Sequence, residues 1–286
     1  MKKFLSYLVI ALIVLVSCIE QDYYSQKAHS VKFISYTGPA TKVQLPFTTG
    51  NISAILVFER ESLSTNFGGT PVLATASAQG ELIPQNNVSL AKGCYDIYSV
   101  SYNNSQNPSL CFENGFSGKL SNNIDYLWAA QKSVVINSEK VIVLNYKRLA
   151  CKIILKVKAD SSFKNLFIRG MKLAVPKTDS LYMNLSQGTI ASSLTSDTLT
   201  SLPGTGIERS TIIVPKRGAT DIEIELDANI NGVNVTKKKY RGLLDIEFIS
   251  GNCYEIELEI ISDKIAVVSS SVSEWRLKNN LVIYSY

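Results

Sequence analysis

The sequence predicts an all-β protein built from antiparallel β-sandwiches, and three observations lead to this fold class. Apolar and charged residues alternate with a period of two along 151–158, 221–227 and 254–260. Clusters of Gly, Asn, Pro and Ser separate such stretches at strand-plus-turn spacing, and helical periodicity is almost absent. Because successive side chains of a strand point to opposite faces, each stretch buries one face and exposes the other. Packing such sheets face to face buries the apolar faces together.

The individual strands follow from these patterns in chain order. In the first half we expect strands at 31–36, 53–59, 81–84, 94–102, 126–130 and 141–146. In the second half we expect them at 151–157, 170–175, 210–214, 222–230, 233–240, 254–260 and 265–268. Asn231-Gly232 lies between two of these runs and predicts a tight hairpin, since a type I′ turn needs positive φ at both central residues. The Ser/Thr/Gly-rich residues 186–206 are poorly periodic and are expected to form a long surface excursion.

The chain length of 286 residues suggests two domains or one large β domain. One expected strand ends and the next begins near 147–150, without a long linker. We therefore expect a signal peptide at 1–17, a tether at 18–29, an N-terminal β-sandwich domain at 30–148 and a C-terminal one at 149–286.

The first eighteen residues are typical of an export signal. Lys2 and Lys3 precede an apolar run over 4–16, which is shorter than the roughly 20 residues that a spanning helix needs. The run ends at Ser17-Cys18 and resembles a bacterial lipobox, which implies cleavage between Ser17 and Cys18 and lipidation of Cys18. The alternative is an ordinary signal peptide with a chance cysteine. Acidic residues follow directly and resemble the signal that sends Bacteroidetes lipoproteins to the outer face of the outer membrane; a solvated acidic tether is the other interpretation.

Composition argues against several classes of function. His29 is the single histidine, which removes His-rich metal sites and most Ser–His or Cys–His catalysis. No run of basic residues exceeds three, so nucleic acid is not expected as a partner. Neither a nucleophile elbow nor a phosphate-cradling glycine loop is present. We expect no enzymatic activity and no cofactor.

Four cysteines follow Cys18 and permit disulfides in an exported chain, with Cys94–Cys111 the nearest pair in sequence; buried free thiols are the alternative. Ser180 and Thr198 each follow Asp and precede Leu, which resembles the O-glycosylation motif of Bacteroidetes exported proteins. A chance occurrence of so short a motif is the other explanation.

Several segments resemble the Bacteroidales fimbrillin superfamily, the subunits and accessory proteins of type V pili. They are residues 90–100, containing Gly93-Cys94-Tyr95-Asp96, residues 125–129, residues 141–153 and the late Trp-bearing stretch 272–275. The resemblance implies two tandem sandwich domains of transthyretin-like topology and partnership with other fimbrial subunits. It also implies surface delivery as a lipoprotein, proteolytic removal of the first strand after a basic residue, and completion of the exposed groove by a neighbour's strand.

The chain departs from that pattern in one respect. The loop behind the first expected strand holds Lys42 but no Arg, and Arg60 is the first Arg of the chain. Either cleavage occurs at Lys42, or the strand is retained as in an anchor or a subunit that does not polymerise. Residues 277–286 are either a donor strand for a neighbour or the last strand of their own domain.

Together these observations predict an outer-membrane lipoprotein that acts as a structural, anchoring or tip component of a type V fimbrium and supports adhesion. The alternative is a surface glycan-binding lipoprotein that does not polymerise. In that case the fourteen Tyr and two Trp of the chain would supply a surface on which sugar rings stack, although packing in the core is the more ordinary role for these residues.

Overall fold

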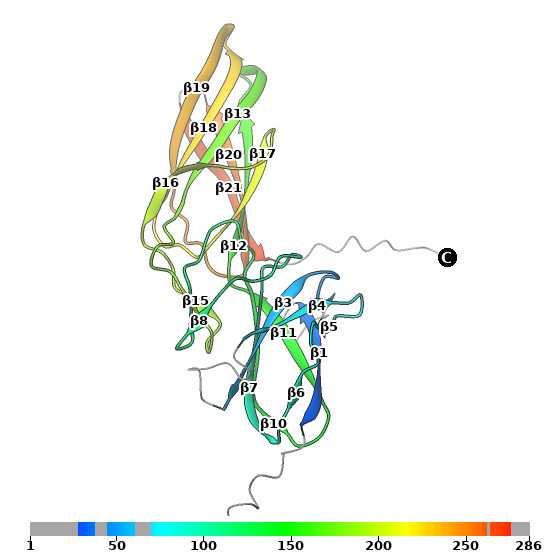
Figure 1. The fold of residues 1–286 in the computed structure, drawn as a ribbon. Coiled ribbons are helices and arrows are strands. Elements are labelled where there is room, and N and C mark those ends of the chain that lie inside the picture. The colour runs from blue at the N-terminus through cyan, green and yellow to red at the C-terminus, as the bar shows by residue number, and fades with distance from the viewer. Residues whose placement is uncertain (1–27, 38–44, 61–69, 262–263, 276–286) are drawn as a thin grey trace, which may run out of the picture.

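The computed structural model describes residues 28–37, 45–60, 70–261 and 264–275, and these residues contain strands and turns but no helix. Among them, therefore, no helix is long and apolar enough to cross a membrane. The all-β prediction is confirmed, and Figure 1 shows the strands gathered at two ends of an elongated molecule.

The first sheet is built entirely from strands that precede residue 149. Its strands run in the order β11-β10-β7-β3-β4-β5-β1-β2, β6 pairs with β1, and β1 also pairs with β11, so the strand path closes on itself. The inward side chains form one apolar cluster that includes Phe33, Ile55, Ile97 and Leu144. The members are β1 (His29–Thr37), β2 (Leu45–Pro46), β3 (Ile52–Glu59), β4 (Val72–Ala76), β5 (Glu81–Pro84), β6 (Ser89–Leu90), β7 (Gly93–Ser101), β10 (Leu127–Ile136) and β11 (Lys140–Arg148).

Two four-stranded sheets that follow residue 150 face each other, and their inward side chains share a second apolar cluster (Figure 1). Alternation along the strands supplies this cluster, as with Ile153, Leu155 and Val157 on one sheet and Ile222, Ile224 and Leu226 on the other. One sheet runs β17 (Glu208–Ile213), β12 (Cys151–Ala159), β20 (Asn252–Ile261) and β21 (Lys264–Glu274). The other runs β16 (Ser196–Ser201), β13 (Phe163–Pro176), β18 (Thr220–Ile230) and β19 (Val233–Leu244).

A small fourth sheet combines strands from both parts of the chain. Its order is β15 (Thr189–Ile190), β14 (Met183–Asn184), β9 (Phe116–Ser117) and β8 (Phe112–Glu113). Beside it lies a third apolar cluster, with Leu56, Tyr98 and Tyr126 from the first part and Met183 and Val214 from the second. This junction cluster ties the first sheet to the two facing sheets.

Two expectations about the strands are corrected by the structure. The sheets are not purely antiparallel, because β1 pairs in parallel with β11 and β12 in parallel with β20; these strands lie far apart in sequence, so long connections can bring them side by side. The excursion over 186–206 also contains β15 and β16, because β14 and β13 offer edges on which these short strands pair. The hairpin at Asn231-Gly232 is confirmed, with φ values of 50° and 87°.

Candidate functional site

The first strand fills a slot inside the first sheet. β1 lies between β11 on one side and β5, β2 and β6 on the other. Its side chains alternate, and four of them are buried: Val31, Phe33, Ser35 and Thr37. Two apolar positions are thus followed by two hydroxyl positions along the slot. Figure 1 shows β1 at the N-terminal end of the described chain, inside this sheet.

Backbone and side-chain hydrogen bonds hold β1 at the hydroxyl end of the slot. The Ser35 N–H and Oγ both donate to the Gly80 carbonyl, at 2.7 and 2.8 Å, and the Phe47 N–H donates to the Ser35 carbonyl at 3.1 Å. Gly80 has φ +81°, and a Cβ built on it would lie 2.5 Å from the Ser35 oxygen. The turn before β5 therefore approaches β1 more closely than any residue with a side chain permits.

A buried polar seam lies next to this end of β1. Tyr146 of β11 stands opposite Thr37 in the register, and its hydroxyl lies 2.6 Å from both the Ser53 Oγ and the Ser99 Oγ. Burial raises the pKa of Tyr146 to about 12, although its two serine hydrogen bonds act in the opposite direction. The phenol therefore stays protonated at neutral pH and can donate to one of the serine hydroxyls.

A set of contacts around Arg148, which we call the latch, joins the first sheet to the facing sheets. The Arg148 Nε donates to the Asp125 Oδ2 at 3.0 Å, and its Nη1 donates to the Trp275 carbonyl at 3.0 Å. The guanidinium also lies 4.7 Å from the centre of the Trp275 ring. Asn103 Nδ2 donates to the same Asp125 oxygen at 2.7 Å. Burial raises the pKa of the Asp125 carboxyl, whereas Arg148 and Asn103 lower it.

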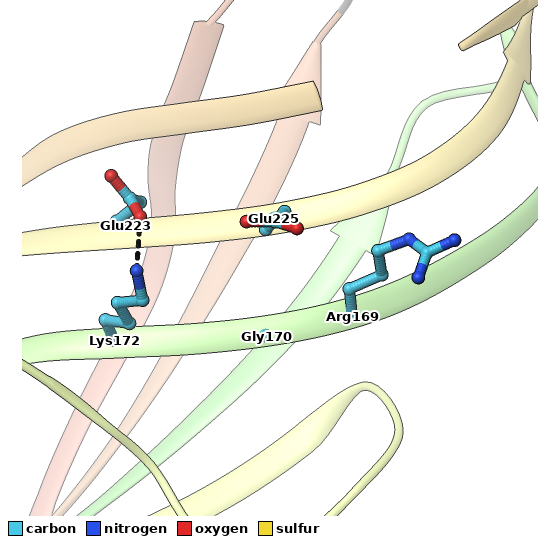
Figure 2. Close-up of a pocket in the computed structure, with 5 residues that line it drawn as sticks. All are labelled: Arg169, Gly170, Lys172, Glu223 and Glu225. Atoms are coloured by element: carbon cyan, nitrogen blue, oxygen red, sulfur yellow. Dashed lines mark hydrogen bonds and ion pairs between the residues drawn. The ribbon is translucent and has the colours of Figure 1, made fainter. Parts of the chain in front are cut away.

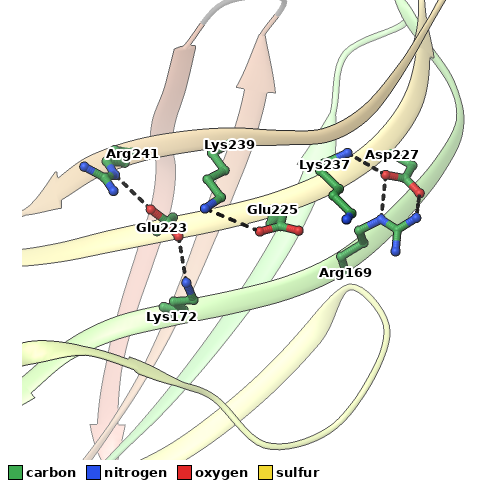
Figure 3. Close-up of polar contacts among 8 residues, drawn as sticks. All are labelled: Arg169, Lys172, Glu223, Glu225, Asp227, Lys237, Lys239 and Arg241. Atoms are coloured by element: carbon green, nitrogen blue, oxygen red, sulfur yellow. Dashed lines mark hydrogen bonds and ion pairs between the residues drawn. The ribbon is translucent and has the colours of Figure 1, made fainter.

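The outward face of β13, β18 and β19 carries columns of alternating charge (Figure 3). Glu223 of β18 is 2% exposed and accepts from the Lys172 Nζ at 3.0 Å and the Arg241 Nε at 2.8 Å, which lowers its pKa. Hydrogen bonds from Arg169 and from the Lys237 backbone lower the pKa of Asp227. Both carboxyl groups are therefore ionised at neutral pH.

A shallow hollow of about 120 Å³ opens on the same face, lined by Arg169, Gly170, Lys172, Glu223 and Glu225 (Figure 2). It exists because Gly170 presents no side chain, and a Cβ built there would meet open space. No group of three or more His, Cys, Asp or Glu side chains in the described part of the chain is arranged to hold a metal ion.

The predicted site residues fall in different places. Ser17, Cys18 and Lys42 lie outside the described residues, so their predicted roles stay predictions. Cys94 on β7 and Cys111 before β8 are free thiols in this structure, and their pairing likewise remains a prediction. Ser180, in a turn, and Thr198, on β16, are both exposed, as an attached glycan would require.

Sequence reasoning missed the slot partners Gly80, Ser53, Ser99 and Tyr146 and the latch formed by Arg148. The positive φ of Gly80 cannot be read from the sequence, where the only sign of it is the glycine itself. Buried serines such as Ser53 and Ser99 likewise cannot be told from exposed serines in a sequence. The alternation of β1 was visible, but its hydroxyl end was not distinguishable from the polar face of an ordinary strand.

Taken together, the geometry defines an all-β protein whose first strand is inserted into an otherwise complete sheet. The chain belongs to the fimbrillin-like family, whose model matches residues 91–275. Membership supports a fimbrial or adhesion role at the cell surface and association with other fimbrial subunits.

Solved structures share the fold at low sequence identity. A candidate cell adhesion protein of Bacteroides uniformis superposes with a TM-score of 0.64 at 12% identity, covering 88% of this chain and 99% of its own. One from Bacteroides ovatus gives 0.62 at 13% identity, covering 88% and 100%. The tip fimbrial protein Mfa3 of Porphyromonas gingivalis, with a C-terminal truncation, gives 0.51 at 10% identity, covering 86% and 100%. No curated protein matches the chain in sequence.

Proposed function

We propose that the chain reaches the cell surface as a lipid-anchored precursor, becomes a subunit of a type V fimbrium and joins its neighbours by β-strand complementation. In this proposal Cys18 carries the lipid after cleavage behind Ser17. The chain comprises two tandem transthyretin-like sandwich domains, 30–148 and 149–286. The end of β11 at Arg148 and the start of β12 at Cys151 in a different sheet support that division.

The observation that carries the proposal is the placement of β1. It is paired on both edges, its four alternate side chains are buried, and it is the first strand of the described chain. Removing it after Lys42 would leave unpaired backbone on β11 and β5 together with an apolar trough. Such a groove is what an incoming strand completes through main-chain hydrogen bonds and alternate side-chain pockets.

The C-terminal sequence has the pattern that this slot requires. The first three of the four buried positions of β1 are Val31, Phe33 and Ser35, and the alternate residues Leu281, Ile283 and Ser285 offer two apolar side chains followed by the same hydroxyl. In each segment the serine is followed by tyrosine, at Tyr36 and Tyr286. We therefore propose 281–286 as the donor strand, running in the direction of β1.

A pair of matched substitutions tests the proposal. Ile283→Lys places a charge at the position equivalent to buried Phe33, whereas Val282→Lys reproduces the exposed Lys32 of β1. We expect Ile283→Lys to abolish the ladder of SDS-resistant multimers in sheared cell-surface material, and Val282→Lys to retain it. N-terminal sequencing of the multimers should begin after Lys42. A monomer band for the wild type would overturn the proposal and leave an anchor that retains its first strand or the glycan-binding alternative.

A further inference from the structure

The two facing sheets present outward faces of inverse charge on opposite sides of the molecule. On one side, the acidic column of β18 lies between basic columns on β13 and β19, as Figure 3 shows. We call this the β18 face. Its acidic residues are Asp221, Glu223, Glu225 and Asp227, and its basic ones are Arg169, Lys172, Lys237, Lys239 and Arg241.

On the opposite side the order of charge is reversed. The basic column of β12 lies between the acidic column of β20 and Glu208 of β17. We call this the β12 face. Its basic residues are Lys152, Lys156 and Lys158, and its acidic ones are Glu208, Glu255, Glu257 and Glu259. The inward neighbours of both columns form the shared apolar cluster, so the two faces point away from each other.

Apart from Glu223, which is 2% exposed, the charges of both faces are at least partly accessible to a second molecule. On the β12 face, Lys156 and Lys158 are 39% and 62% exposed, and their partners Glu255 and Glu257 are 36% and 25% exposed. On the β18 face, Lys239 is 51% exposed and reaches Glu225 only at 3.8 Å. These partly exposed side chains can turn toward charges above the sheet without leaving a buried ion unpaired.

Outward side chains have the same spacing on both faces. Neighbouring strands lie about 4.8 Å apart, and outward side chains recur about every 6.7 Å along each strand. When the β18 column is laid over the β12 column, three of its four acids face Lys152, Lys156 and Lys158, and the fourth faces Ile154. On the flanks, the acidic column of β20 faces one basic column, and Glu208 of β17 faces the other. Laying either face on another copy of itself, with the central strands superposed, opposes like charges instead.

We propose that a second copy of this chain docks its β18 face on the β12 face of the first. Because the two faces are different and point in opposite directions, the contact is heterologous and can repeat along a row of copies. Each exposed ion pair contributes at most about 1 kcal/mol, so one contact is weak. Where copies already stand in fibres, as in the proposed function, many such contacts act together and bind fibres side by side. The contact itself does not require strand complementation.

The test is a co-capture assay with the full chain in a nonionic detergent, in which a tagged copy on beads captures an untagged copy. The β18-face variant carries Glu225→Gln and Lys239→Gln; the β12-face variant carries Lys156→Gln, Lys158→Gln, Glu255→Gln and Glu257→Gln. Each removes cations together with their carboxylate partners, so folding is preserved. Arg217→Gln with Glu247→Gln, which removes an exposed pair away from both faces, is the matched control.

We expect wild type and control to be captured at about 0.01 M salt, where charges act over about 30 Å, and at least about tenfold less at about 1 M. Neither face variant captures itself. A β18-face bait captures a β12-face prey, because that pair retains one intact β12 face and one intact β18 face. Wild-type capture that is indifferent to salt, or self-capture by either variant, overturns the proposal.

Strand complementation is read separately in the same samples. Multimers joined by a donated strand survive SDS and high salt, whereas the charged contact survives neither. Failure of the proposed function therefore removes the SDS-resistant ladder and leaves salt-sensitive capture in place, and failure of the present inference does the reverse.

Discussion

Gly80 is the residue at which the body of the first sheet comes nearest to β1. Replacement by alanine meets two penalties: φ is +81°, and the new Cβ would lie 2.5 Å from the Ser35 carbonyl oxygen. We expect Gly80→Ala to lower the free energy of unfolding by about 3 kcal/mol or more, combining backbone strain with displacement of β1. Urea denaturation measures this loss.

Gly50 is the matched control for that substitution. Its φ is +82°, but a Cβ built there meets nothing within 4 Å. Gly50→Ala therefore carries the cost of positive φ alone, about 1–2 kcal/mol. Equal losses at the two glycines would contradict the close approach of the turn to β1.

At the scale of the elements, Glu223 joins three strands. It accepts from Lys172 of β13 and Arg241 of β19, and these hydrogen bonds lower its pKa from 4.5. A lowered carboxyl pKa contributes stability that is present above the unfolded pKa and is lost as pH falls through the folded pKa. We expect Glu223→Gln to cost about 1 kcal/mol at pH 7, since both cations are partly exposed to solvent.

The same substitution makes a pH-dependent prediction. Below the lowered pKa, wild-type Glu223 is protonated and resembles glutamine, so the stabilities of the two proteins should converge. Urea denaturation at a series of acidic pH values follows that convergence. A difference that persists undiminished in acid would show that the charge of Glu223 is not what joins the strands.

Element by element, the sequence predicted strands where alternation is regular and failed where it is broken. β12, β18 and β20 follow a strict period of two and were found within a few residues. β13 extends from Phe163, seven residues before its predicted start at Gly170, because bulges between Lys164 and Gly170 interrupt its period. β4 was missed because it has only five residues, and its sequence, Val-Leu-Ala-Thr-Ala, does not alternate clearly between apolar and polar. A bulge shifts one strand against its partner, and only the partner reveals it.

The site was less predictable than the strands. The position of the first strand followed from its pattern, but the junction cluster draws on side chains as far apart as Leu56 and Val214. No local period marks such residues, since their contacts depend on how separate sheets are placed. The sequence shows that charged residues alternate with apolar ones along each strand. It does not show which strands are neighbours, and the arrangement of acidic and basic columns on the two outer faces depends on that.

For the whole molecule, the junction determines whether the first sheet and the facing sheets unfold together. Besides the latch at Arg148, the Trp128 Nε1 donates to the Leu185 carbonyl at 2.8 Å, and the Asn123 N–H donates to the Ile212 carbonyl at 2.7 Å. Apolar side chains from both sides pack between these bonds. We expect a continuous interface of this kind to couple the two parts into one cooperative unit.

Arg148→Ala removes the latch while leaving both large clusters intact. It leaves the Asp125 carboxylate, at 10% side-chain exposure, with Asn103 but without its cation, and it frees the Trp275 carbonyl. Loss of one partner of a buried pair costs about 3–5 kcal/mol, and here that loss falls on the interface. We therefore expect calorimetry to show one thermal transition in the wild type and two in Arg148→Ala.

The control is Lys147→Ala, at the neighbouring residue, whose Nζ lies 4.6 Å from the centre of the Trp128 ring. This variant should keep a single transition. If Arg148→Ala instead shifted one transition downward without splitting it, the apolar junction cluster alone would be sufficient to couple the two parts.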